Sequence, residues 1–395
     1  MTPLAGVRVL DLSGRIGAYC GKILADLGAD VVKVELPIGD RLRHLPPYRD
    51  GEHGPESSLL FAYYHHNKRG ITLDWERDEA LPLLGELSAS VHVVLASPKG
   101  EPQRLAGYVE NPPSLSWVAG DVVTRFISPF GLTGPYREWR ATPFTSFAMS
   151  GSMHAVGPPD GPPLAMPGQQ FYDEAGAWAA FLVQAVLRSP RHLWAQVIDH
   201  SVHEFGLFYK LGTEQYGLDG RIKTRATNFG PPPGGVWRCA DGFLDIGAHA
   251  AHHWDLFVDL LGRPAELADP IYRDRQMRIQ LFDLLNDSIG TLLLTRSARQ
   301  LVEAGQAAGL PCALSQTGAQ FVREPQSTAR GFFVRTCRPG TGSFDIPGAP
   351  FRSAPPLIAY RRPAPTLGEA NADVYVGELG HSEAELERWV ADGLV

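Results

Sequence analysis

Residues 6–12, GVRVLDL, and residues 28–35, GADVVKVE, decide the fold of this chain. Both are short apolar runs that begin with glycine, and Gly17 to Leu27 between them carries small and apolar residues at helical spacing. Two strands joined by a single helix must be parallel, and their crossover must be right-handed. The segment therefore predicts a βαβ unit that opens a Rossmann-like parallel sheet in an α/β protein.

The alternation of strands and helices continues to about residue 130. Further strands are expected at Gly70–Leu73, Val91–Ala96, Leu115–Val118 and Gln196–His200, and a helix at Glu76–Ala89. A second helix is expected to begin near Asp173 and to bury its larger apolar residues, Trp178, Leu182, Val183, Val186 and Leu187.

The later part of the chain indicates a second unit. Thr213 to Gly235 is polar and rich in turn residues, as expected of a crossing between domains. Strands Val236–Cys239 and Phe243–Gly247 follow, and then helices from His252 to about Ala308. Pro339 to Pro365 is extended and rich in proline, and residues 382–391 have a helical pattern.

Composition and charge narrow the functional class. The 395 residues suggest two or three domains, and the net charge of −7 argues against a broad nucleic-acid-binding face. The longest aliphatic stretch, Ala175 to Leu187, is too short to cross a hydrocarbon core of ~30 Å, and the first residues lack the pattern of a signal peptide. Four widely spaced cysteines are expected to be reduced thiols in a cytoplasmic protein: Cys20, Cys239, Cys312 and Cys337.

Several familiar catalytic patterns are missing. The glycines after the first strand do not form GxGxxG, although Glu35 has the place of the acidic residue in a dinucleotide site. No GxSxG elbow is present, and Cys312 is interpreted as a buried cysteine at the end of a strand. The histidine groups lack the HExxH pattern, so no metal site is expected and surface or helix-capping roles are favoured: His65, His66, His249, His252 and His253.

Asp173 has two open interpretations. It stands between the flexible run Gly168 to Tyr172 and a helix expected to start at Glu174, where aspartate is a good N-cap residue. The same amide donors and helix dipole would also keep the carboxylate ionised and oriented as a nucleophile.

Segments spread along the chain together resemble the family III CoA-transferases, of the carnitine/formyl-CoA transferase type. The N-terminal ones are residues 3–12, 25–35, 39–40, 67–69, 71–74 and 131–136. The later ones are residues 149–151, 160–163, Asp173 with Gly176, 235–242, 308–312, 347–350 and 367–369. Each is weak alone, but together they occur in the family's order.

The resemblance implies a large Rossmann-like domain built from both chain ends, a smaller α+β middle domain and an interlocked, ring-like homodimer. The corresponding division is residues 1–212, a crossing at 213–233, a small domain at 234–325 and a return at 326–395. The resemblance also implies that Asp173 attacks an acyl-CoA thioester and then carries CoA as an aspartyl thioester to a carboxylic acid. No tightly bound cofactor is expected, and no nucleic acid or membrane partner.

The resemblance also implies where coenzyme A binds. The expected contacts lie at the carboxyl edge of the first strands: Arg15, Leu73, Asp74, Ser97, Lys99 and Arg104. Ala96 to Gly100 replaces the family's Asn-Phe-Arg-Pro-Gly-type loop, and the loop Ser13 to Gly17 is one residue shorter than usual. The glycine-rich lid over the substrate is reduced to Gly234 and Gly235.

Two alternative functions remain open at this point. An α-methylacyl-CoA racemase of the same fold needs a histidine base where this chain has Thr142, and threonine cannot serve as that base. A CoA-binding protein without turnover would use Asp173 only as a helix cap. Covalent labelling of Asp173 by acyl-CoA distinguishes a transferase from both.

Overall fold

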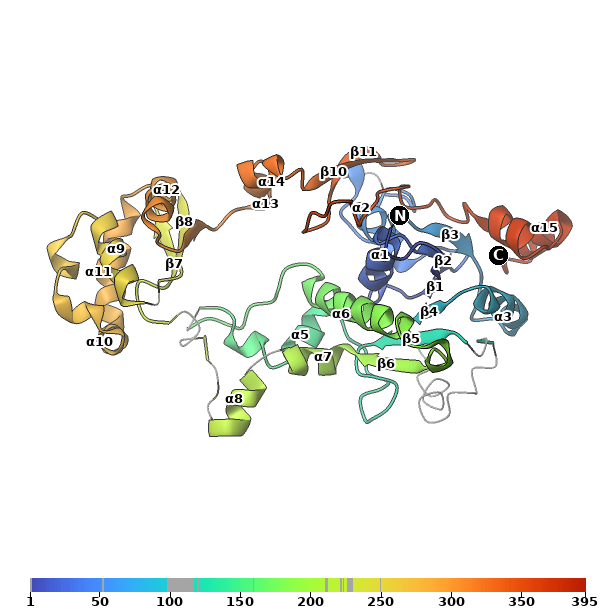
Figure 1. The fold of residues 1–395 in the computed structure, drawn as a ribbon, viewed down its shortest axis with the longest axis horizontal. Coiled ribbons are helices and arrows are strands. Elements are labelled where there is room, and N and C mark those ends of the chain that lie inside the picture. The colour runs from blue at the N-terminus through green and yellow to red at the C-terminus, as the bar shows by residue number, and fades with distance from the viewer. Residues whose placement is uncertain are drawn as a thin grey trace. The chain divides into compact units, whose positions relative to one another are not determined.

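The computed structural model forms two compact units (Figure 1). It describes residues 2–51, 53–97, 117–118, 121–158, 160–209, 212–220, 222, 224–225, 230–248 and 250–395. Unit 1 comprises Met1–His154, Leu164–Ile222 and Phe332–Val395, and unit 2 comprises Ala155–Pro163 and Lys223–Gly331. No helix in the described part of the chain is both long and apolar enough to cross a bilayer.

Unit 1 contains a six-stranded parallel sheet in the order β3-β2-β1-β4-β5-β6. The strands are β1 Arg8–Leu12, β2 Asp30–Glu35, β3 Arg69–Thr72, β4 Val93–Ala96, β5 Val123–Ser128 and β6 Val197–Ser201. This is the doubly wound order, in which the chain reverses direction across the sheet between β1 and β4. The predicted βαβ opening and parallel sheet are confirmed.

One predicted strand of this sheet is wrong. Residues 117–118 form a turn, and residues 115–116 of the predicted strand Leu115–Val118 lie outside the described residues. The strand that follows β4 is β5, whose apolar run is interrupted by Arg125. Arg125 is nevertheless fully buried, because its guanidinium contacts the His200 ring on neighbouring β6.

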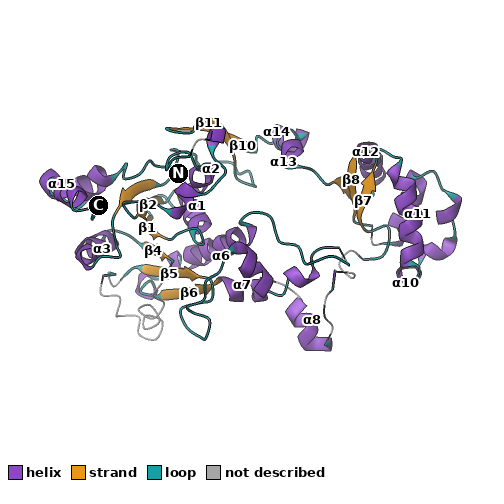
Figure 2. Ribbon diagram, turned by 180° about the vertical axis from the view of Figure 1, so that it is seen from behind, coloured by secondary structure: helices purple, strands orange, loops and turns teal. Residues whose placement is uncertain are grey.

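Helices cover both faces of the sheet (Figure 2). The α-helices described in unit 1, whether or not they touch the sheet, are α1 Ala18–Asp26, α2 Leu59–Tyr64, α3 Leu81–Ala89, α5 Pro143–Met149, α6 Gln170–Leu187, α7 Val202–Tyr209, α8 Gly212–Asp219 and α15 Glu383–Ala391, together with the π-helix η10 Ala372–Glu378. Apolar residues of α3, η10 and α15 pack with Leu10 and Val32 in one core. Helices α1 and α6 cover the opposite face, and the hairpin of β10 Phe333–Arg338 and β11 Gly342–Pro347 completes the described strands of the unit.

Small residues set the position of α6 against α1. A Cβ atom on Gly176 would lie 3.1 Å from the Cys20 backbone nitrogen and 3.1 Å from the Tyr19 Cβ. The buried face of α6 is accordingly rich in alanine and glycine. Trp178, which the sequence places on the buried side, is 38% exposed, because it lies outside the buried stripe of α6.

Unit 2 is a small α+β assembly. Its antiparallel sheet has the order β7-β8-β9, from β7 Gly235–Cys239, β8 Gly242–Ile246 and β9 Cys312–Leu314. The α-helices described in it are α9 Ala251–Leu260, α10 Arg275–Gln280, α11 Phe282–Leu294, α12 Ala298–Ala308, α13 Gly318–Phe321 and α14 Pro325–Ala329. Cys312 is buried at the start of β9 and burial raises the pKa of its thiol, in agreement with a packing role.

Candidate active site

Asp173 lies within helix α6 and is not its N-cap. The helix begins at Gln170 with Gln169 as the N-cap residue, and the Asp173 N–H already donates to the Gln169 carbonyl at 3.0 Å. The interpretation of Asp173 as a cap is therefore wrong. Burial of Phe171 and Tyr172 in the preceding turn extends the helix toward its N-terminus, and Phe171 packs 5.7 Å from the Phe147 ring.

The Asp173 carboxylate is held by one neutral donor. The Tyr64 hydroxyl lies 2.8 Å from Oδ1 and 2.9 Å from Oδ2. Tyr64 is 4% exposed and ends helix α2, whose first turn is capped by the Ser58 hydroxyl. The two helices thus bring together a phenol and a carboxylate that are 109 residues apart in sequence.

Burial is the main influence on the acidity of this carboxylate. It raises the pKa of Asp173 to about 6, against the lowering effects of the Tyr64 hydrogen bond and of Arg15. At pH 7 the group is then ionised in about ten molecules to one. Its position in the first turn of α6 favours the anion further. Asp173 is consequently an ionised carboxylate with little direct charge compensation, which suits a nucleophile.

Arg15 reaches the same place from the loop after β1. Its Nε–H donates to Oε1 of Gln169, the residue that caps the helix of Asp173. Burial lowers the pKa of Arg15, while Tyr172, Tyr64 and Asp173 raise it.

Buried polar groups fix the start of this loop. The Asp11 carboxylate accepts hydrogen bonds from the Ser13 N–H at 2.9 Å and from its hydroxyl at 2.5 Å. The Lys33 ammonium donates to the Ser13 carbonyl at 2.6 Å. The Lys68 ammonium holds Asp11 in turn, at 2.7 Å between two fully buried side chains. Gly21 is required above them, because a Cβ there would lie 2.4 Å from the Asp11 Oδ2.

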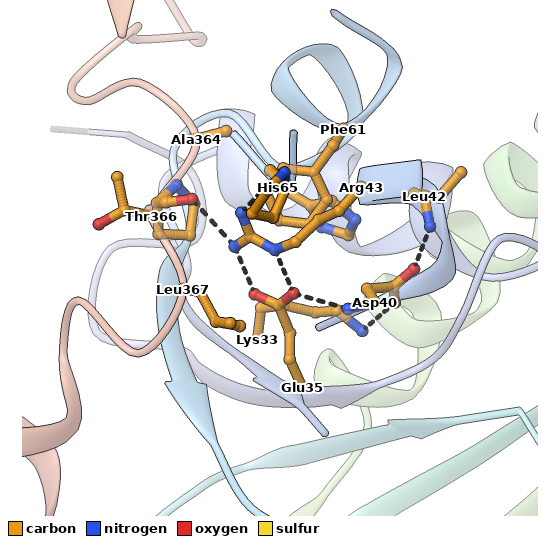
Figure 3. Close-up of polar contacts among 12 residues, drawn as sticks. Lys33, Glu35, Asp40, Leu42, Arg43, Phe61, His65, Ala364, Thr366 and Leu367 are labelled. Atoms are coloured by element: carbon orange, nitrogen blue, oxygen red, sulfur yellow. Dashed lines mark hydrogen bonds and ion pairs between the residues drawn. The ribbon is translucent and has the colours of Figure 1, made fainter. Parts of the chain in front are cut away.

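A second buried network occupies the end of β2 (Figure 3). The Arg43 guanidinium donates to both oxygens of Glu35, at 2.6 and 2.7 Å, and Lys33 pairs with Asp40 at 2.9 Å. Because Glu35 is completely buried and already bound by Arg43, it is not available to a dinucleotide ribose. Glu56 joins Arg43 to Arg338 and so links the N-terminal part of unit 1 to its C-terminal part.

The paired histidines are buried, contrary to the expectation of surface positions. His65 is fully buried and His66 is 3% exposed, and burial lowers the pKa of both rings. His65 does have the C-cap position of α2, and its Nδ1 lies 3.1 Å from the Lys68 Nζ. His249 lies outside the described residues. Within the described ranges, no three or more His, Cys, Asp or Glu side chains are placed to hold a metal ion.

Several expected CoA contacts share one edge of the sheet. Arg15, Asp74 and Ser97 follow β1, β3 and β4, whose carboxyl ends meet at that edge because the strands are parallel. The Ser97 hydroxyl is buried and has no hydrogen-bond partner among the described residues. Leu73 differs, since its side chain is completely buried in the apolar core. Lys99 and Arg104 lie outside the described residues, and Gly234 and Gly235 belong to unit 2.

Sequence reasoning missed Tyr64 and Gln169. Tyr64 directly precedes the histidine pair that drew attention as a metal motif, and no spacing relates it to Asp173. Thr142 is an N-cap, with its hydroxyl accepting from the Thr145 N–H at 3.2 Å, so the structure gives the position of the racemase base a capping role.

Comparison with known proteins identifies the family. The family model described as CoA-transferase family III matches residues 4–371. The chain belongs to this family. It is 29% identical to the succinyl-CoA–D-citramalate CoA-transferase of Chloroflexus aurantiacus, over 97% of this chain and 96% of that protein. It is also 29% identical to the succinate–glutarate CoA-transferase of Agrobacterium fabrum, over 94% of each chain.

Solved structures give the same result. The crystal structure of a CaiB/BaiF family protein from Brucella suis matches with a TM-score of 0.83 and 25% identity, covering 96% of this chain and 99% of that one. The predicted family is therefore confirmed, and coenzyme A thioesters are the substrates of its members.

Proposed function

We propose that this chain transfers coenzyme A from an acyl-CoA thioester to a carboxylic acid, with Asp173 as the nucleophile. The observation that carries the proposal is the state of Asp173: a largely buried carboxylate with its pKa raised to about 6, bonded to Tyr64 and, among the described residues, to no cation. An anion that is poorly compensated gains from forming a neutral acyl derivative, which is what attack on a thioester produces.

The transfer proceeds through four exchanges of acyl groups. An Asp173 oxygen attacks the thioester carbonyl, the C–S bond breaks, and CoA thiolate leaves with the electron pair. The thiolate attacks the Asp173 acyl carbon of the resulting mixed anhydride and releases the donor acid as its carboxylate. The acceptor carboxylate then attacks the aspartyl-CoA thioester and frees the thiolate again. Finally the thiolate attacks the acceptor's acyl carbon, which releases acyl-CoA and restores the Asp173 carboxylate.

Tyr64 has a defined part in this scheme. Its hydroxyl points at both oxygens of Asp173 in the free enzyme, and burial raises the pKa of the phenol, so it stays a donor. When thiolate attacks the Asp173 acyl carbon, one of these oxygens becomes an oxyanion. A donor already in place lowers the barrier at that step without reorganisation.

We retain the proposal that CoA lies along the carboxyl edge of the sheet. Asp74, Ser97, Lys99 and Arg104 are its proposed contacts there, and Leu73 can contribute only through its backbone because its side chain is in the core. Gly234 and Gly235 are proposed to form the reduced lid. Loss of CoA affinity in Arg104→Ala, measured by calorimetry, tests this placement.

A homodimer of interlocked chains, with the four-part division of residues given above, is also proposed. An exposed aromatic group supports an interface on α6 and α7: Trp178 is 38% exposed, Phe181 56% and Phe208 71%. Their rings contact one another, with centroids 5.2 and 5.7 Å from that of Trp178. A patch of this kind on a protein surface usually marks an interface. A monomer in sedimentation at micromolar concentration would contradict the dimer.

The proposed activity is tested by following acyl exchange directly. Succinyl-CoA is incubated with a panel of carboxylic acids, and new CoA esters are separated and quantified. Wild type is expected to form at least one new ester, and Asp173→Asn none, because an amide is a poor nucleophile toward a thioester. Glu174→Gln is the matched control, since it neutralises the adjacent carboxylate and should retain transfer. Transfer by folded Asp173→Asn at the wild-type rate would overturn the proposal.

A further inference from the structure

Arg15 carries two hydrogen-bonding groups that have no partner in the described part of the chain. Its Nε–H is bound to Gln169, and its two Nη groups have no hydrogen-bond or ion-pair partner among the described residues. The side chain is half-buried, and its guanidinium is bound at Nε. A planar fork of this kind, fixed at one nitrogen, is suited to bind a carboxylate with the other two.

A second arginine influences the charge of Arg15. Arg41, exposed in the 3₁₀-helix Arg41–His44, lies near enough to oppose the charge of Arg15. The Asp173 carboxylate stabilises the Arg15 charge, and this stabilisation disappears whenever Asp173 carries an acyl group or CoA. The Arg15 charge is then left without this carboxylate, and an anionic group of the bound substrate can take its place.

A phosphate of CoA does not fit this place. When the thioester reaches Asp173, the length of the pantetheine arm separates it from the phosphates, whereas Arg15 is bonded to Gln169, the N-cap residue of the helix that carries Asp173. Arg15, expected from the family resemblance to contact CoA, is thus better placed to meet the acyl group. The anionic part of an acyl group is a second carboxylate.

We propose that Arg15 binds the distal carboxylate of a dicarboxylic acid and so selects dicarboxylates as acyl groups. The inference rests on the proposed function, since it takes Asp173 as the reacting centre. Gln169 orients the fork by holding its Nε, and it is also the N-cap of the helix that carries Asp173. Gln169 therefore links the reacting carboxylate of Asp173 to the guanidinium that recognises the substrate. The acids named in the two relatives, succinate, citramalate and glutarate, are all dicarboxylic.

The test compares each dicarboxylate with its own monoamide, which has nearly the same shape but lacks the distal charge. Glutarate and glutaramate, and adipate and adipamate, are offered as mixed pairs, with succinyl-CoA as the donor. Both acids of a pair compete for the same aspartyl-CoA enzyme, so the product ratio is independent of the donor steps. Wild type is expected to favour at least one dicarboxylate, by about 10- to 100-fold, the usual range for a charge-assisted hydrogen-bonding pair.

Arg15→Gln is expected to bring that ratio close to one, and Arg15→Lys to give an intermediate value because the charge remains but the fork is lost. Arg388→Gln, which removes an exposed arginine on α15, should leave the ratio unchanged. Melting temperatures of the variants establish that they are folded. An unchanged ratio in folded Arg15→Gln overturns the proposal, as does a wild type that prefers no dicarboxylate in any pair.

A separate measurement distinguishes this inference from the proposed function. Wild type and Arg15→Gln are incubated with succinyl-CoA, and the peptide that contains Asp173 is weighed after trapping with hydroxylamine. An adduct in wild type together with an unchanged product ratio in Arg15→Gln refutes the role of Arg15 alone. Absence of the adduct in wild type refutes the proposed function, and the selection argument with it.

Discussion

Asp11, which is fully buried, and Asp173, which is partly exposed, are carboxylates of the same unit whose pKa values are shifted in opposite directions. Burial would raise the pKa of Asp11, but Lys68 and Lys33 outweigh it and lower that pKa below its usual value. At Asp173 the effect of burial prevails, and the pKa rises to about 6. The difference lies in the hydrogen-bonding partners: Asp11 has a buried ammonium at 2.7 Å, whereas the partner of the Asp173 carboxylate among the described residues is a phenol. Full charge compensation makes a carboxylate structural, and incomplete compensation leaves it reactive.

Acidic side chains with cationic partners are found in unit 1 well beyond Asp11. Glu35 and Glu56 are bound by Arg43, and Glu56 also accepts the Leu367 N–H at 3.0 Å. Asn67 accepts the Arg361 N–H at 2.6 Å and so attaches the same C-terminal part of the chain. These contacts join distant parts of the chain, and each charge has a partner that burial makes costly to remove. The motif residues 67–69 therefore serve the fold, although they stand out in sequence as strongly as Asp173.

The largest effect is expected from neutralising Asp11. Asp11→Asn keeps the acceptor for Ser13 but leaves the Lys68 ammonium buried without a countercharge. An unpaired buried charge typically costs about 3–5 kcal/mol, so the free energy of unfolding, measured with urea, should fall by that amount. Asp30→Asn is the control, because Asp30 is also paired, with Arg69, but is 40% exposed. It should cost no more than about 1 kcal/mol. Equal losses in the two variants would show that burial does not distinguish these pairs.

A smaller effect is expected from removing the phenol at Asp173. Tyr64→Phe deletes the hydrogen bond that lowers the pKa of Asp173, so that pKa should rise above its present value of about 6. Because the ionised carboxylate is the reactive form, kcat/KM of wild type should fall as the pH drops through about 6. In the variant this fall should begin at a higher pH than in wild type. At pH 8 the variant should retain about a tenth of the activity.

Tyr63→Phe provides the control for this profile. Tyr63 is the neighbouring residue on α2, and the described structure gives it no hydrogen bond to Asp173. Its removal should leave the acidic limb of the kcat/KM profile near that of wild type. A Tyr64→Phe profile with an unchanged midpoint would mean that the phenol does not tune Asp173.

The smallest effect concerns stability at Asp173. Because its pKa is raised in the folded state, the stability associated with the protonated form is fully present below about pH 3.8 and is lost as the pH rises through about 6. Asp173→Asn cannot ionise, so at pH 7 it should be more stable than wild type, by about 1 kcal/mol after allowance for partial exposure. The gain should shrink as the pH falls below 6. Destabilisation by Asp173→Asn at pH 7 would place Asp173 with Asp11 among the structural carboxylates.

The sequence predicts the fold around Asp11 better than it predicts the surroundings of Asp173. The glycine-bounded runs around residues 6–35 predict the βαβ opening because local pattern alone determines it. The resemblance singled out Asp173, but its place inside α6 depends on the tertiary burial of Phe171 and Tyr172. Its contact with Tyr64 joins residues 109 positions apart, for which a single sequence carries no signal.

Direct detection of the acyl enzyme tests the central claim most plainly. The protein is mixed with succinyl-CoA, quenched with hydroxylamine or borohydride, digested, and the peptide containing Asp173 is weighed and fragmented. A mass change located at Asp173 in wild type, present also in Glu174→Gln and absent in Asp173→Asn, is the result expected. An unmodified Asp173 peptide in an enzyme that turns over CoA esters, or a modification at another residue, would contradict the assignment of Asp173 as the nucleophile.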